Sequence, residues 1–123
     1  QAVGSTVWVD DESRMDAVTA ISGSGPAYVF LFIEALQQAA GELIFTPQAA
    51  RQLALDTVLG SARLAAQSAD PASVLRERVT SKGGTTEAAL RVMDERALKD
   101  IVTAAAAAAC ARSTELGDLL GKD

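Results

Sequence analysis

Residues 24–41 read SGPAYVFLFIEALQQAAG, and they decide whether this chain folds as helices or as a sheet. Residues 27–33 are apolar on every side, so by themselves they are compatible with a buried strand. The residues that follow are strong helix formers, and Pro26 suits the first turn of a helix. The serine two residues earlier can cap that turn, and the glycine at the end can terminate the helix. The stretch therefore predicts one buried helix over residues 26–40.

The same start signal, a capping residue before proline, recurs at Thr46-Pro47 and at Asp70-Pro71. No β-hairpin signal accompanies these helix starts, so the chain is predicted to be all-α, a helical bundle. Further helices are expected at residues 48–68, after residue 71, after the segment SKGGTT and at 98–120, with a shorter one behind the acidic residues 10–12. Residues 7–9, VWV, are expected to form a strand-like entry or a tail that packs on a partner.

The composition describes a core of small and aliphatic side chains. Of the 123 residues, 49% are hydrophobic but only 4% are aromatic, so Ala, Leu and Val must fill the interior. The length indicates one domain, and the net charge of −5 argues against a nucleic-acid partner, because phosphate binding needs a basic surface. The apolar runs at residues 27–33 and 104–111 are shorter than the ~18 residues that suggest a membrane span, so no membrane partner is expected.

The chain has one cysteine and no histidine, which limits the chemistry that it can carry. Because Cys110 is alone, no internal disulfide can form, which fits a reducing compartment and a cytoplasmic protein. It lies in an alanine-rich run, where a thiol usually acts as a small buried hydrophobe. The lack of histidine removes Ser-His and Cys-His nucleophile systems and most zinc sites, and no metal is expected.

Residues 79–90 read VTSKGGTTEAAL, and they interrupt the helical pattern with two glycines and several hydroxyl side chains. The first amides of the helix that follows have no partners inside it and lie at the positive end of its dipole. The glycines remove side chains that would keep a ligand away, and Ser81, Thr85 and Thr86 add short hydroxyls. The segment therefore predicts a pocket for a small anion, most naturally a carboxylate or a phosphate. An ordinary turn that binds nothing is the alternative, since glycine often ends helices and threonine often caps them.

This segment is not a phosphate-binding P-loop. The GxxxxGK[ST] pattern places lysine after the last glycine, whereas Lys82 precedes both glycines, and no strand leads into the segment. An enzyme that grips a nucleoside triphosphate through this segment is therefore not expected.

Two stretches taken together resemble the C-terminal domain of the Δ1-pyrroline-5-carboxylate reductase family. The first is DAVTAISGSGPAY at residues 16–28, and the second is VTSKGGTT at residues 79–86, followed by Ala88-Ala89-Leu90. The ending ARSTEL at residues 111–116 also resembles the family's closing helix, so the resemblance spans essentially the whole chain. Lys82 departs from the pattern, because many members have proline there. The resemblance implies an all-α domain, similar to the C-terminal domain of 6-phosphogluconate dehydrogenase-like reductases, that interlocks with a second copy.

The resemblance also implies a reaction and a site. Hydride from NADPH or NADH reduces the C=N carbon of pyrroline-5-carboxylate and yields L-proline, the last step of proline biosynthesis. By position, Ser81 hydrogen-bonds the substrate carboxylate. Main-chain amides around Gly84 and Thr85 cradle that carboxylate, and Gly83 is a further substrate-binding residue. The hydroxyl of Thr86, the implied catalytic residue, lies near the ring nitrogen. Because threonine is a very weak acid, the proton comes from water or from a substrate already protonated, and catalysis depends mostly on positioning.

The cofactor is implied to bind mainly to an N-terminal dinucleotide-binding domain that precedes this region in the family. No Gly-x-Gly-x-x-Gly follows a strand in residues 1–123. The chain is therefore expected to be the C-terminal substrate-binding and dimerisation domain, inactive without the dinucleotide-binding domain, and the missing initial methionine fits this. Val18 and Ser22 are implied to lie near the nicotinamide.

The resemblance further implies a homodimer or higher oligomer in which two chains build each active site. The alanine-lined last helix and the apolar helix at residues 26–40 are consistent with that assembly. Two alternatives stay open: a non-catalytic helical dimerisation module, and the helical domain of another imine or hydroxyacid reductase. A helical adaptor for an acidic peptide is disfavoured by the net charge of −5.

Overall fold

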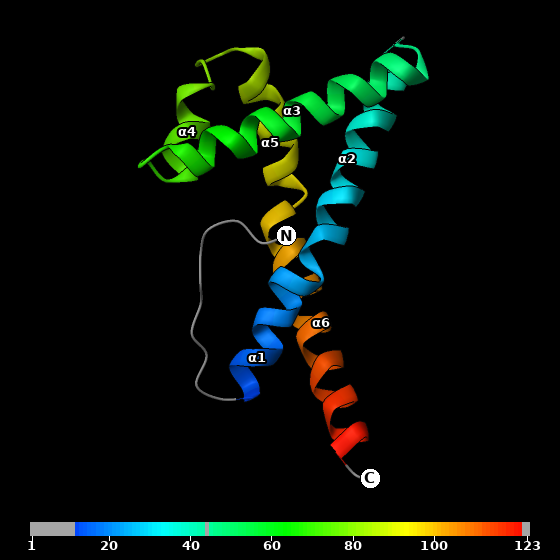
Figure 1. The fold of residues 1–123 in the computed structure, drawn as a ribbon. Helices are drawn as coiled ribbons and strands as arrows, with labels where there is room; N and C mark the ends of the chain where they lie inside the picture. Colours follow the sequence, from blue (N-terminus) through cyan, green and yellow to red (C-terminus); the bar gives the residue numbers. More distant parts are fainter. Residues whose placement is uncertain (1–11, 44, 122–123) are drawn as a thin grey trace. The chain divides into compact units, whose positions relative to one another are not determined.

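The computed structural model describes residues 12–43 and 45–121, and every regular element in these ranges is a helix (Figure 1). The prediction of an all-α chain is confirmed for this part of the protein. The expected strand-like segment at residues 7–9 lies outside the described residues. The elements are α1 (Glu12–Val18), the π-helix η1 (Thr19–Gly23), α2 (Gly25–Glu42), α3 (Pro47–Gln67), α4 (Ala72–Arg78), α5 (Thr85–Glu95) and α6 (Leu98–Gly121).

The apolar stretch at residues 27–33 is helical, as its helix-forming continuation predicted, but α2 is entered differently from the expectation. Ser24 was expected to be an N-cap with extended backbone, yet its dihedral angles are helical (φ −87°, ψ −23°). Its N–H donates to the Thr19 carbonyl at 2.8 Å, five residues back, which is the hydrogen bond of a π-helix. Because of this bond, the helical backbone continues from η1 into α2 across Gly23 and Gly25. The expected end was wrong as well, because Gly41 lies inside α2.

As a consequence, residues Arg14–Glu42 form one helical segment of 29 residues that is long and apolar enough to cross a membrane by length and composition alone. The apolar runs counted from the sequence were shorter because residues 22–26 were expected to break the helix. The core helix of a soluble protein and a signal sequence pass the same test, so this segment does not by itself assign a membrane location.

The other two cap-proline signals have different outcomes. Thr46 caps α3 as predicted, since its Oγ1 accepts the Ala49 N–H at 3.2 Å and Pro47 is the first helical residue. At α4, Pro71 itself occupies the N-cap position and no side chain caps the helix. Asp70 instead forms an ion pair with Arg78 at 2.7 Å.

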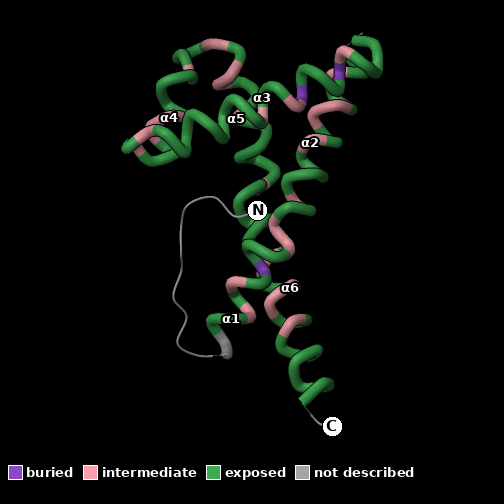
Figure 2. Tube along the Cα trace, viewed as in Figure 1, coloured by how far each residue is buried: buried purple, intermediate pink, exposed green. Residues whose placement is uncertain are grey.

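The chain divides into two compact units, residues 1–27 together with 99–123, and residues 28–98. The expectation that residues 1–123 form one domain stays a prediction. Very little of the described chain is buried (Figure 2): the buried hydrophobic residues are Ala20, Ala50 and Ala54. Large apolar side chains of α2 are exposed instead, with Phe30 at 63% and Leu31 at 67%. Large contiguous apolar patches of this kind are typical of surfaces that contact a partner or a membrane.

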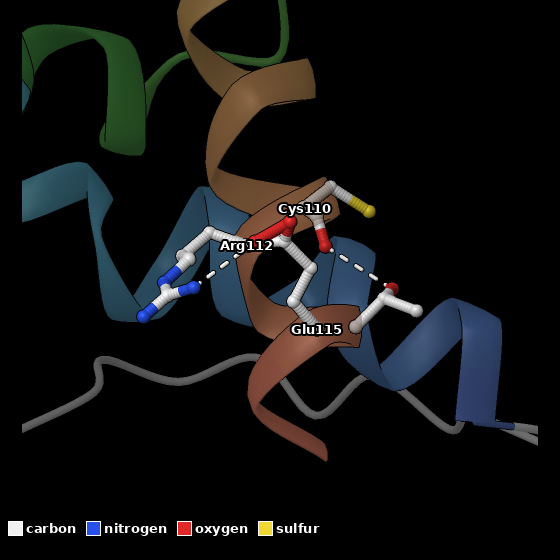
Figure 3. A network of polar contacts seen from close by, with 4 residues as sticks. Cys110, Arg112 and Glu115 are labelled. Carbon is white, nitrogen blue, oxygen red and sulfur yellow. Dashed lines mark hydrogen bonds and ion pairs between the residues drawn. The ribbon is translucent and has the colours of Figure 1, made fainter. Parts of the chain in front are cut away.

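Within the first unit, the Asp16 carboxylate of α1 joins α6. One carboxylate oxygen accepts the Ser113 hydroxyl at 2.7 Å and the other accepts the Thr114 hydroxyl at 2.8 Å. Thr114 Oγ1 is also 3.2 Å from the Cys110 carbonyl, but a hydroxyl has one hydrogen, so the shorter, charge-assisted bond to Asp16 dominates. Near Cys110, Arg112 and Glu115 of α6 form an ion pair at 3.1 Å (Figure 3). Cys110, expected to be buried, is half-buried with a free thiol.

Replacing Asp16 by alanine is expected to lower the free energy of unfolding by about 2 kcal/mol, because hydrogen bonds to a charged group contribute more than neutral ones. Urea denaturation at one fixed protein concentration measures this change. Asp118→Ala is the matched control, since it removes an exposed carboxylate of α6 for which no contact is found among the described residues. Equal stability of the two variants would contradict a stabilising role for Asp16.

Candidate functional site

The candidate site is the loop between α4 and α5. Its first residues close α4: the Thr80 N–H donates to the Glu77 carbonyl at 3.1 Å, and the Thr80 hydroxyl donates to the Arg76 carbonyl at 2.6 Å. Thr80 therefore uses both of its hydrogens to close α4, and the residues of the loop with free hydroxyl donors begin at Ser81.

The next four residues form a tight turn that explains both glycines. The Gly84 N–H donates to the Ser81 carbonyl at 3.0 Å. Gly83 has φ of +75°, a left-handed conformation that residues with a Cβ rarely adopt. At Gly84 the constraint is space, because an added Cβ would lie 3.2 Å from the Ser81 carbonyl oxygen and 3.3 Å from Ser81 Cβ. Each glycine thus has its own physical reason within the turn, a left-handed backbone at Gly83 and a close approach at Gly84.

The Gly83 and Gly84 amides of the predicted site already have hydrogen-bond partners within the chain. The Gly84 N–H is used by the turn, and the Gly83 N–H donates to Glu87 Oε1 at 3.0 Å. Helix α5 begins at Thr85, and its first internal acceptor is the Gly84 carbonyl, bonded by the Ala88 N–H at 3.3 Å. Within the described ranges, the N–H groups of residues 85–87 have no hydrogen-bond partner, as expected for the first turn of a helix.

Three hydroxyls accompany these free amides. Ser81, Thr85 and Thr86 form no side-chain hydrogen bond to any residue that the structure describes, and Thr86 is half-buried while the other two are exposed. Lys82 is also exposed. The amides are donors, the hydroxyls can donate, and the positive end of the α5 dipole favours negative charge, an arrangement that suits a small anion.

Glu87 is the residue of this loop that the sequence reasoning missed. It stands at the third position of α5 and accepts the Gly83 N–H, and it forms an ion pair with Arg91 at 3.6 Å, one turn further along. A glutamate three residues after a helix cap is a known sequence signal. Here that signal was hidden because the cap is Gly84, which has no side chain to complete the usual capping box.

The two residues assigned to the nicotinamide end belong to the other compact unit. Val18 is half-buried at the end of α1, and the exposed Ser22 lies in η1. The Ser22 hydroxyl donates to the Val18 carbonyl at 2.9 Å, which leaves its oxygen free only as an acceptor. Among the described residues, no group of three or more His, Cys, Asp or Glu side chains could hold a metal ion.

Comparison with known proteins supplies the family. Residues 12–116 match the family model described as pyrroline-5-carboxylate reductase dimerisation. The pyrroline-5-carboxylate reductase of Pseudomonas aeruginosa is 46% identical over 98% of this chain and 44% of its own length, so the chain spans less than half of that relative. The pyrroline-5-carboxylate reductase structure from Coxiella burnetii matches with a TM-score of 0.88 and 45% identity, over 93% of this chain and 42% of that one. The Plasmodium falciparum enzyme, solved with NADP bound, matches with a TM-score of 0.84 and 37% identity, over 88% of this chain and 41% of that one. The chain therefore belongs to the pyrroline-5-carboxylate reductase dimerisation family.

Proposed function

We propose that this chain is the C-terminal, substrate-binding and dimerisation domain of a reductase that converts pyrroline-5-carboxylate to L-proline. The family membership and the names of the relatives support this activity. The single observation of the site that carries it is the set of free amides and free hydroxyls at the start of α5. The proposed substrate is an anion with one carboxylate, which is the kind of group such a set of donors binds.

In this proposal the substrate carboxylate accepts hydrogen bonds from the amides of Thr85 and Thr86 and from the Ser81 hydroxyl. Charge-assisted bonds of this kind are stronger than neutral ones and fix the orientation of the ligand. The Gly83 and Gly84 amides, already bonded within the chain, act by shaping the turn instead of by contacting the substrate. In this proposal the two glycines shape the turn, and the amides of the two threonines bind the substrate.

The Thr86 hydroxyl is proposed to lie beside the ring nitrogen of the imine. As a half-buried hydroxyl with no partner in the described chain, it is able to orient the nitrogen and the proton that the nitrogen gains. An alcohol is too weak an acid to be the source of that proton, which comes from water or from a protonated imine. The rate enhancement then comes mainly from holding the imine carbon in a reactive position.

The reduced nicotinamide supplies the hydride when it is bound, and we place most of its binding in a dinucleotide-binding domain outside residues 1–123. Within this chain, the Ser22 oxygen can accept a hydrogen bond from an amide N–H, which fits the carboxamide of a nicotinamide. Val18 would pack beside it. The NADP bound to the Plasmodium falciparum enzyme supports a nicotinamide dinucleotide as the cofactor.

We further propose that the exposed apolar face of α2 is covered by a second copy of the chain, in a homodimer or a higher oligomer. The family model describes dimerisation, and Phe30 and Leu31 are among the most exposed large apolar side chains. A partner subunit, instead of a membrane, then explains why the 29-residue helical segment is apolar. We therefore propose a cytoplasmic location.

Thr86→Ala tests the proposed site. In the full-length reductase, kcat/KM for pyrroline-5-carboxylate is expected to fall by about 10–100-fold, the loss expected when one hydrogen bond to a charged group is removed. Thr86→Ser keeps the hydroxyl and is expected to retain most of the activity. Thr103→Ala is the matched control, because the Thr103 hydroxyl bonds only the Lys99 carbonyl of its own helix, at 2.9 Å. Unchanged kinetics in Thr86→Ala would remove Thr86 from the site.

A second candidate function, a non-catalytic dimerisation module, is favoured by the exposed apolar side chains of α2 and by the family description. It is tested by titrating the full-length protein with L-proline while light scattering reports the oligomeric state. A dimer that does not bind L-proline in the presence of a nicotinamide dinucleotide would favour this module over the reductase.

A further inference from the structure

Glu87 makes two contacts in the substrate loop that the proposed catalytic roles do not use. Its Oε1 accepts the Gly83 N–H at 3.0 Å, and the same oxygen lies 3.6 Å from Arg91 Nη2. The Glu87 side chain is 38% exposed, so neither contact is buried deeply. The three residues form a chain of contacts, Arg91 to Glu87 to Gly83, that links the turn to the first two turns of α5.

The turn needs such a link because consecutive glycines are conformationally free. Gly83 must stay in the left-handed region (φ +75°), but the free energy of an isolated glycine there is about the same as in its other allowed conformations. The residue after it, Gly84, is fixed by the hydrogen bond from its N–H to the Ser81 carbonyl, and this bond lies within the turn. The bond from Gly83 N–H to Glu87 is different, since it joins the turn to the helix that offers the free amides.

We propose that Glu87 is a positioning residue for the substrate: it holds the Ser81–Gly84 turn against the start of α5, so that the Ser81 hydroxyl and the amides of Thr85 and Thr86 keep one mutual geometry. This inference rests on the proposed function. Without the link, only a fraction of the molecules have the binding geometry, and the apparent affinity falls in proportion to that fraction. The chemical step is unaffected once the substrate is bound.

The charge of Glu87 makes the choice of variants important. A carboxylate at the start of α5 repels an anionic substrate, so any neutral replacement weakens this repulsion while it also changes the link. Glu87→Ala removes both the charge and the hydrogen bond. Glu87→Gln removes the charge alone, because its amide oxygen still accepts the Gly83 N–H. The ratio of KM values between these two variants therefore isolates the hydrogen bond.

The experiment measures steady-state kinetics with pyrroline-5-carboxylate and saturating NADPH in the full-length reductase. The KM of Glu87→Ala is expected to exceed that of Glu87→Gln by about three- to tenfold, the effect of losing one hydrogen bond, with kcat values within about twofold of each other. Glu87→Asp, whose shorter side chain keeps the charge but cannot span to Gly83, is expected to raise KM at least as much as alanine does. Glu95→Ala, at the other end of α5, is the matched control and is expected to leave KM unchanged.

A KM ratio between Glu87→Ala and Glu87→Gln below threefold would overturn the proposal, as would a loss confined to kcat. If Glu87→Ala does not fold, the comparison of Glu87→Asp with Glu87→Gln decides in the same way. A purely structural role would lower the melting temperature of Glu87→Ala without separating the two KM values, and this outcome also contradicts positioning. Failure of the proposed function is distinguishable, because then the unaltered full-length protein would not reduce pyrroline-5-carboxylate, and there would be no KM values to compare.

Discussion

Gly84→Val is expected to raise the KM for pyrroline-5-carboxylate by about 100-fold or more, or to abolish measurable binding of L-proline. The backbone of Gly84 is extended (φ −92°, ψ −174°), so valine meets no conformational strain there. The effect comes from space: a Cβ would already lie 3.2 Å from the Ser81 carbonyl oxygen, and two further methyl groups must displace Ser81 or cover the free amides of α5. A displacement of about 1 Å in a positioning element is enough for a loss of this size.

Gly60→Val is the control for this experiment, because a Cβ at Gly60 in α3 meets no described residue within 4 Å beyond the adjoining backbone of its own helix. Steady-state kinetics and L-proline titration of both variants, with circular dichroism to verify that the helices remain, make the comparison. Gly84→Ala is expected to have a smaller effect than valine, since a single methyl group displaces Ser81 by only a few tenths of an ångström. Normal kinetics in Gly84→Val would exclude this loop as the substrate site.

The double variant Phe30→Asp, Leu31→Asp is expected to raise the dissociation constant of the dimer by about 100-fold or more. Both side chains belong to α2, both are more than 60% exposed in the single chain, and α2 has no buried residue. Burying a charge in an apolar interface is costly unless the charge is paired, so two aspartates oppose association strongly. Light scattering across a range of protein concentrations measures the change in mass.

Ala69→Asp adds the same kind of charge at an exposed position of the loop between α3 and α4, and it is expected to leave the dimer intact. Because folding and association are linked in many homodimers, the double variant is also expected to unfold at a lower temperature than the control. A double variant that remains dimeric at the concentrations of the control would show that another surface forms the interface.

Much of the helical arrangement could be predicted from local signals. Thr46-Pro47 starts α3 as expected, and the expected helix over residues 98–120 corresponds to α6 (Leu98–Gly121). The prediction was wrong where a local signal competed with a hydrogen bond from further back in the chain. Ser24 had the sequence of an N-cap, but the bond from its N–H to the Thr19 carbonyl kept it helical and joined α1 to α2 through η1.

The glycines and threonines of the sequence were enough to locate the candidate loop. They were not enough to predict which N–H groups of the loop remain free. Which N–H groups remain available depends on side-chain conformation, and here Glu87 takes the Gly83 amide while the turn takes the Gly84 amide. Glycine in place of a capping serine or threonine at position 84 hid the role of Glu87, because the usual motif has a hydroxyl at its first position.

By itself, the sequence determined that the chain is helical, that α3 begins at the Thr46-Pro47 signal and that a donor-rich turn precedes α5, because these features depend on residues within a few positions of one another. Only the tertiary structure decided that Asp16 binds two hydroxyls 97 and 98 residues away. It also decided that alanines, and none of the large apolar side chains, make up the buried core of the described residues. Such contacts depend on how helices that are distant in the sequence pack against one another in space. The periodicity of residues within one helix does not determine this packing.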